Sequence, residues 1–188
     1  MAALSALPQF TEVLVDAPAL TALSTNINAL CQQVTGKLPS TGVSSKPVCK
    51  VWQTATRSVA NATVAVIPWD AELVDTDNMW TPGNSSIITI QTAGWYDVHL
   101  QTVWANGSLG QRTAIIFVNG TANPANVAAE KDELMGQTGS VKVQAHLYDH
   151  FAAGTVLRGA YYQDTGGSLS TLTTSGSVWM SVAYDAPY

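Results

Sequence analysis

Charge is what this sequence has least of. Asp, Glu, Lys and Arg make up only 11% of its 188 residues, whereas about 25% is typical of globular domains. The hydrophobic fraction, 46%, is ordinary, so the missing charge is replaced mainly by Ser, Thr and Asn. A disordered tail needs low hydrophobicity and high net charge, and this chain has neither. Uncharged polar residues in this proportion favour an exposed protein rich in β-strands.

Basic residues and long apolar runs are also scarce. The chain has 8 Lys and Arg against 13 Asp and Glu, which excludes the basic surface that nucleic-acid binding needs. Apolar runs such as Ala114–Val118 are far shorter than the ~20 residues of a membrane span, so we expect no membrane insertion. Met1–Leu7 contains no basic residue and is unlike a secretory signal. We therefore expect the protein to be made and kept in a cytosol.

Cysteine occurs twice, as Cys31 and Cys49. Two thiols in a long chain do not form a disulfide framework, and free, partly buried thiols are favoured, although a disulfide between the two stays open. No Cys-x-x-Cys pair is present, so the cysteines give no support for a redox or zinc site.

The N-terminal part has a helical pattern. Asp16 can cap a helix that begins near Pro18, and Gly36 would end it, which predicts a helix over about 17–35. Its apolar residues alternate at spacings of three and four and form a narrow stripe: Leu20, Leu23, Ile27, Leu30 and Val34. This stripe packs either on the chain's own domain or in a bundle with other copies. Residues 37–46 are rich in Pro, Ser, Thr and Gly and indicate a linker, so we predict an N-terminal segment over 1–48 and a domain over 49–188.

Residues 49–188 have the pattern of strands and turns. In Gly94–Trp104 one side of the predicted strand carries Tyr96, Val98 and Leu100, while polar residues alternate with them. Asn106-Gly107 is a strong hairpin signal, because both residues accept a positive φ. Further strands are predicted at the following segments: Thr63–Ile67, Ser85–Gln91, Arg112–Val118, Val141–Leu147, Thr155–Tyr162 and Ser177–Tyr184. About eight to ten short strands without a helical pattern among them indicate a sandwich or barrel.

No group of residues indicates catalysis. The sequence lacks a Gly-x-Ser-x-Gly or phosphate-loop motif. His146 and His150 would lie ~13 Å apart on one strand face, too far to share a metal ion, and a surface contact is favoured for Asp149 and His150. Asp97 and His99 share the polar face of their strand, where a cross-strand hydrogen bond or an interface position is expected. We therefore predict no catalytic residue, no metal site and no cofactor.

Acidic residues are densest between Asp70 and Asn78. Their carboxylates could hold calcium through oxygen ligands, but the segment lacks the glycine and distal Glu of the known calcium loop. A solvated loop, or capping of neighbouring backbone amides, is favoured for these residues: Asp70, Glu72, Asp75 and Asp77.

Tryptophan, in contrast to charge, is abundant, with six in the chain. Trp104 falls on the same strand side as Tyr96 and is expected to be buried. Trp95 and Trp179 fall on the opposite side of their strands and could contact a neighbouring molecule. A subunit interface is favoured for these two residues over a sugar-binding site.

Several segments, in order, resemble the jelly-roll domains of the complement head and of tumour necrosis factor. They are Ser86–Tyr96 with its Ala-Gly-x-Tyr motif, Ala114–Gly120 ending in Asn-Gly, Val141–Leu147, Gly154–Leu157 and Ser177–Ala183. The resemblance covers about residues 50 to 185. It implies a mainly β, ten-strand jelly-roll sandwich that forms homotrimers. The collagen stalk common in this family is absent, because no Gly-x-y run occurs.

A second resemblance concerns context. Pro68–Trp80, followed by Ala-Gly-Trp-Tyr at 93–96, is similar to virion proteins of bacteriophages that infect actinobacteria. It implies a non-enzymatic structural component of a virion, assembled in the host cytoplasm. We expect a homotrimeric minor tail or fibre protein that binds the host surface, with a surface glycan as one partner and tail or major capsid proteins as others. The alternative is a capsid decoration or head fibre, and a polysaccharide-active enzyme is less expected.

Overall fold

The structure is a computed structural model that describes residues 46–120, 127–135, 139–173 and 178–187. The helix predicted over 17–35, its apolar stripe and Cys31 lie outside the described residues, so these predictions stay predictions. Among the described residues, no helix is long and apolar enough to cross a membrane.

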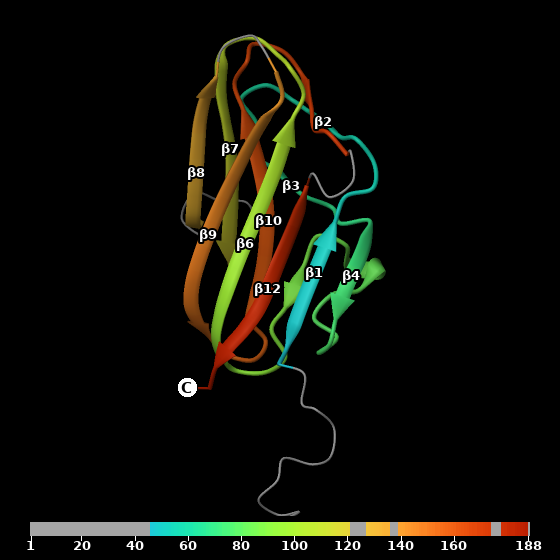
Figure 1. Cartoon of the computed structure of the whole chain (residues 1–188), viewed down its shortest axis with the longest axis vertical. Helices are drawn as coiled ribbons and strands as arrows, with labels where there is room; N and C mark the ends of the chain where they lie inside the picture. The colour runs from blue at the N-terminus through green and yellow to red at the C-terminus, as the bar shows by residue number, and fades with distance from the viewer. Residues whose placement is uncertain (1–45, 121–126, 136–138, 174–177, 188) are drawn as a thin grey trace, which may run out of the picture. The chain divides into compact units, whose positions relative to one another are not determined.

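Two antiparallel sheets form the domain, and one of them has five strands (Figure 1). In spatial order these strands are β4 (Ala71–Asp75), β1 (Val48–Trp52), β12 (Trp179–Ala186), β6 (Gly94–Trp104) and β9 (Val141–Phe151). They follow one another across the nearer layer in Figure 1, with β7 and β10 behind them.

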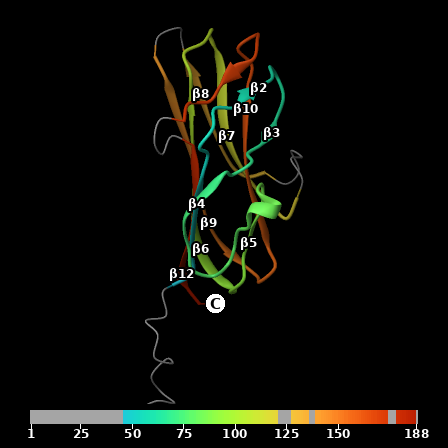
Figure 2. The ribbon, with the colours of Figure 1, turned by 90° about the vertical axis from the view of Figure 1, so that its right-hand side faces the viewer.

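The second sheet has the order β3 (Ala65–Val66), β10 (Val156–Gln163), β7 (Gly110–Val118) and β8 (Val127–Met135), and β5 (Ile88–Thr89) also pairs with β10. A small sheet pairs β2 (Ser58–Val59) with β11 (Leu169–Ser170). Seen from the side, β12 and β5 lie on opposite sides of the molecule (Figure 2). The predicted mainly β sandwich is confirmed.

The core lies between the two large sheets, because each strand turns alternate side chains inward. On β6 the inward residues are Tyr96, Val98 and Leu100, all inaccessible to solvent, as the alternation predicted. Trp104 is also fully buried, and its ring packs edge-on against Tyr161 with centroids 5.7 Å apart. Buried aromatic rings of this size contribute much of the packing energy of a small sandwich.

The hairpin predicted at Asn106-Gly107 is wrong. β6 pairs with β12 and β9, whereas β7 belongs to the other sheet, so the loop between them crosses from one sheet to the other. Neither residue has a positive φ. A Cβ at Gly107 would lie 2.6 Å from Leu169 Cδ1, so a larger residue there would require the Leu169 side chain to shift. Asn119, by contrast, does adopt a left-handed φ of 52°, and its Oδ1 accepts a hydrogen bond from the backbone N of Val156 at 2.9 Å.

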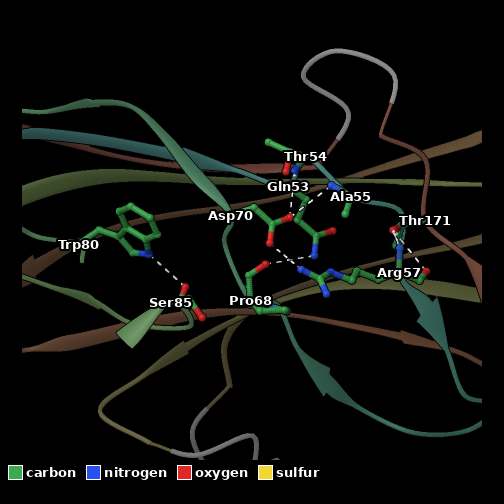
Figure 3. Close-up of polar contacts among 9 residues, drawn as sticks. All are labelled: Gln53, Thr54, Ala55, Arg57, Pro68, Asp70, Trp80, Ser85 and Thr171. Atoms are coloured by element: carbon green, nitrogen blue, oxygen red, sulfur yellow. Dashed lines mark hydrogen bonds and ion pairs between the residues drawn. The ribbon is translucent and has the colours of Figure 1, made fainter. Parts of the chain in front are cut away.

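Two predicted strands are shorter than expected. Ser85–Gln91 contributes only β5, and Thr63–Ile67 only β3. The one-turn 3-10 helix η1 (Pro82–Asn84) precedes β5, and Ile87 N donates to Asn84 O. The Trp80 indole also donates to Ser85 O at 3.0 Å (Figure 3). In Ser85–Gln91 these local hydrogen bonds occupy backbone groups that would otherwise extend the strand ladder.

Candidate binding face

The side of the five-stranded sheet that faces away from the core carries an unusual set of aromatic and titratable residues. We call it the binding face. It is defined by the outward residues Lys50 and Trp52 on β1, Leu73 on β4, Trp95, Asp97, His99 and Gln101 on β6, Gln144, His146, Tyr148 and His150 on β9, and Trp179, Ser181 and Ala183 on β12. The same period-two alternation that buries Tyr96 and Val98 turns these residues outward.

One end of the binding face is an aromatic pocket. Trp52 on β1 lies directly opposite Trp179 on β12, and together with Lys50 and Leu73 they line a hollow of about 190 Å³. Lys50 Nζ lies 4.3 Å from the centroid of the Trp179 ring, a cation–π contact. Leu73 is 71% exposed. An apolar hollow that retains so much exposed surface is suited to a partner.

The other end of the binding face is an aromatic stack. The Trp95 and Tyr148 rings are nearly parallel, with centroids 5.5 Å apart, and His150 packs edge-on against Trp95. The Tyr148 hydroxyl donates a 2.8 Å hydrogen bond to Asp185 Oδ2. This hydrogen bond to the carboxylate raises the pKa of Tyr148. The stack presents large, well-positioned rings at the surface, which is typical of interface anchors.

Between the two ends, three titratable side chains converge. Asp97 Oδ1 lies 2.5 Å from His146 Nε2 and 3.0 Å from His99 Nε2, and the two imidazole rings stack with centroids 4.3 Å apart. Burial by itself raises the pKa of Asp97. The hydrogen bonds and positive charge of the two histidines outweigh it, so the pKa of Asp97 is lowered. The cross-strand hydrogen bond predicted for this face is confirmed, and its partner is His146.

Both tryptophans selected from the sequence, Trp95 and Trp179, lie on the binding face. Trp179 is opposite Gln101 on β6, six residues along from Trp95, which places the two about 20 Å apart at roughly 3.3 Å per residue. Their roles as interface or ligand residues stay predictions.

The sequence analysis did not predict that Trp52, Leu73 or Tyr148 would belong to the binding face. The alternation of β9 could have shown that His146 and Tyr148 share a face, but only strand register shows which residues of β6 they meet.

The acidic residues near Asp70 serve the loops around them. Asp70 pairs with Arg57 at 2.5 Å and accepts hydrogen bonds from the backbone N of Thr54 and Ala55 (Figure 3). Asp75 accepts three more, from the backbone N of Asp77, Met79 and Trp80. The predicted capping of backbone amides is therefore confirmed for Asp70 and Asp75.

Cys49 is a free thiol and is completely buried on the inward side of β1. Burial, reinforced by the charges of Asp75 and Glu72, raises the pKa of the Cys49 thiol. A protonated thiol in the core acts as a small hydrophobic residue, so Cys49 belongs to the packing of the domain.

The sandwich is similar to the jelly-roll domains of tumour necrosis factor and the complement C1q head. Three solved structures share it. Murine APRIL at pH 5.0 matches with a TM-score of 0.59 and 8% identity, over 75% of this chain and 100% of that chain. The Eiger tumour necrosis factor of S. frugiperda matches with a TM-score of 0.56 and 12% identity, over 77% of this chain and 95% of that chain.

The globular domain of the zebrafish complement 1qA protein matches with a TM-score of 0.55 and 10% identity, over 77% of this chain and 100% of that chain. At these identities the likeness shows the fold alone. No protein-family model and no curated protein matches the chain.

Proposed function

We propose that this chain is a non-enzymatic binding module that acts as a homotrimer, with the binding face of each copy packed against its neighbours. Domains of this fold typically form homotrimers and are generally not catalytic. The observation that carries the proposal is the make-up of the binding face. Large aromatic residues at both ends, Trp95 and Trp179, remain partly exposed, with the small residues Ser181 and Ala183 between them. Buried interface centres are enriched in such aromatic residues and depleted of charge.

The low charge of the whole chain supports this proposal. Only 11% of its residues are charged, and surfaces that become subunit contacts disfavour Lys and Glu. On the binding face the charged groups are held in contacts within the chain, as in the pairing of Asp97 with His99 and His146. A neighbouring copy would therefore cover few unpaired charges.

The finer part of the proposal is the biological setting. We propose a component of a bacteriophage virion, in the role of a minor tail or fibre protein that contacts the host surface. Its support is the similarity of Pro68–Trp80 and of the Ala-Gly-Trp-Tyr motif at 93–96 to virion proteins. In this setting residues 1–48 attach the module to tail or capsid proteins, and the β-domain projects outward.

Light scattering after size exclusion tests the trimer. We expect about three times the 19.8 kDa of one chain, and a single-chain mass at micromolar concentration would refute the homotrimer.

Replacing Leu23 and Ile27 by Asp tests whether the N-terminal apolar stripe attaches the protein to particles. The double variant should no longer co-purify with particles, while its β-domain keeps the unfolding midpoint of the parent chain. Unchanged incorporation would contradict the attachment role.

Antibody labelling of purified virus particles tests whether the protein is a virion component and where on the particle it lies. Label at the tail supports the tail role, whereas label over the capsid supports the decoration alternative. Purified particles that lack the protein would overturn the virion proposal in either form.

A further inference from the structure

We propose that Asp97, His99 and His146 form a binding site for a divalent transition-metal ion, with Zn²⁺ as the preferred ion. The three side chains lie at the middle of the binding face, and all come from one copy of the chain. Among the residues that the structure describes, they are the group whose potential metal ligands converge.

The spacing of the ligand atoms is close to what zinc requires. One oxygen of Asp97 and one nitrogen from each histidine lie within 4.8 Å of one another. Around a tetrahedral Zn²⁺ with bonds of about 2.0–2.2 Å, neighbouring ligand atoms are roughly 3.3 Å apart. The present separations of 2.5 and 3.0 Å from Asp97 Oδ1 are hydrogen-bond distances. The two separations from Asp97 therefore need to lengthen by less than about 1 Å to admit the ion, and the two histidine nitrogens, which lie within 4.8 Å of each other, need to shift by less than about 2 Å.

The backbone holds these ligands in place. His99 on β6 lies directly opposite His146 on β9, and Asp97 is two residues before His99 on the same side of β6. β6 is paired on both edges, by β12 and by β9, so its backbone is fixed by two ladders. The side chains retain freedom to adjust, because Asp97, His99 and His146 are each about half exposed. A fixed backbone with adjustable side chains is well suited to capture an ion.

The ligand types select the ion. Two imidazole nitrogens and one carboxylate oxygen suit zinc and its neighbours in the first transition series, whereas calcium and magnesium prefer sites made of oxygen alone. The thiol of Cys49 is buried on the inward side of β1, so it is not available as a ligand on the binding face. Three protein ligands leave a fourth position for water.

The proposal does not depend on trimer formation, because one chain supplies all three ligands. The test uses the full chain without an affinity tag, freed of metal by a chelator and titrated with ZnCl₂ in a calorimeter. We expect one Zn²⁺ per chain. With free Zn²⁺ at about 100 times its dissociation constant, the unfolding midpoint should rise by roughly 5–10 °C. Co²⁺ in the same site should give the intense visible bands of a tetrahedral ion, and Ca²⁺ and Mg²⁺ should give no shift.

Three variants locate the site. Asp97→Ala and His146→Ala should each weaken Zn²⁺ binding by roughly 100-fold or more, because each removes a direct ligand. His150→Ala is the matched control. It removes a histidine from the same strand, four residues further on and outside the converging group, and it should leave the affinity within about threefold. Circular dichroism and the metal-free unfolding midpoint show whether each variant is folded.

The metal site is overturned if the parent chain binds no Zn²⁺. It is also overturned if the His146→Ala variant binds Zn²⁺ as tightly as the parent chain does. Loss of binding in the His150→Ala control as large as in His146→Ala would overturn it as well. These outcomes are separate from those of the trimer. A trimer that binds no zinc refutes only the metal site, and a zinc-binding monomer refutes only the homotrimer.

Discussion

The two large sheets differ in how far the apolar residues on their outward sides are exposed to solvent. On the second sheet, the outward residues Ile115 and Phe117 of β7 and Ala160 of β10 are at most 3% exposed and form a small cluster of their own. On the five-stranded sheet, Trp95, Trp179 and Tyr148 face outward and keep part of their surface in contact with solvent. The outward apolar residues of the second sheet are thus buried within the chain, whereas those of the five-stranded sheet remain partly exposed.

The contrast indicates which side is available to a partner. A small cluster buried in its own chain contributes to folding and has little left to contribute to binding. Partly exposed aromatic rings contribute to both, because their remaining surface can be buried by another molecule. Substitutions on the two sides should therefore separate stability from association, and the following predictions are ordered by the size of their expected effect.

Phe117→Ala should give the largest effect, on stability. Phe117 is 1% exposed, and truncating a buried Phe to Ala costs about 3–5 kcal/mol through lost burial and the cavity left behind. Urea unfolding measures the change. Leu109→Ala, at a residue 67% exposed, is the control and should stay within about 0.5 kcal/mol of the parent. A loss below about 1 kcal/mol for Phe117→Ala would remove the contrast between the two sides.

Trp179→Ala should act on association instead. Truncating an aromatic anchor at an interface typically costs 2 kcal/mol or more of binding free energy, so the trimer should dissociate at concentrations about 30-fold or more above those of the parent. Light scattering over a dilution series measures this. Phe117→Ala is the counterpart, since it should lower stability yet keep the trimer at temperatures where the chain is folded. A Trp179→Ala protein with the parent's dissociation behaviour would contradict the proposed interface.

Tyr96→Phe tests the inward side of β6 and should cost about 1 kcal/mol, since the Tyr96 hydroxyl donates a 2.6 Å hydrogen bond to Thr92 O. Burial, with the charge of Asp77, raises the pKa of Tyr96 to about 12. The folded state thus favours the neutral phenol, so this contribution is complete below pH ~10. It is lost as pH rises from ~10 through 12.

The measurement is the difference in unfolding free energy between parent and Tyr96→Phe at several alkaline pH values. The other tyrosines and the lysines are common to both chains and cancel in the difference. A difference that stays constant through this range would mean that Tyr96 titrates as an exposed tyrosine does.

Lys50→Ala should have the smallest effect, about 0.5–1 kcal/mol of stability, because it removes the cation–π contact with Trp179. Lys142→Ala on β9, an exposed lysine on the same side of the sheet, is the matched control and should change urea unfolding by no more than about 0.5 kcal/mol. Equal losses in the two variants would show that net charge, and not the contact with the Trp179 ring, is responsible.

Alternation along the chain was sufficient to predict much of the fold. It placed Tyr96, Val98, Leu100 and Trp104 on the buried side of one strand and Trp95 on the other, and the structure agrees. It failed at Asn106-Gly107, because a turn signal shows that the chain can reverse but not which sheet receives the next strand. There the loop packs against the side chain of Leu169, which is distant in sequence and invisible to local turn patterns.

The candidate site was only partly predictable for a related reason. Parity along single strands identified Trp95 and Trp179, and it paired Asp97 with His99. The approach of His146 to Asp97 depends on the register between β6 and β9, and a shift of one residue would turn His146 to the opposite face. Register is a property of two strands together, so neither segment carries it alone.

The position of β12 determines when the binding face can exist. β12 lies between β1 and β6, and Val48 pairs with Ala183, near the two ends of the described domain. During synthesis β1 and β6 emerge early, each with an edge that has no partner until Trp179–Ala186 has been made. Contacts between such distant segments form slowly, and unpaired edges invite association with other chains. Assembly of copies through this face must therefore follow completion of the domain, which makes correct closure of each chain a condition for oligomer formation.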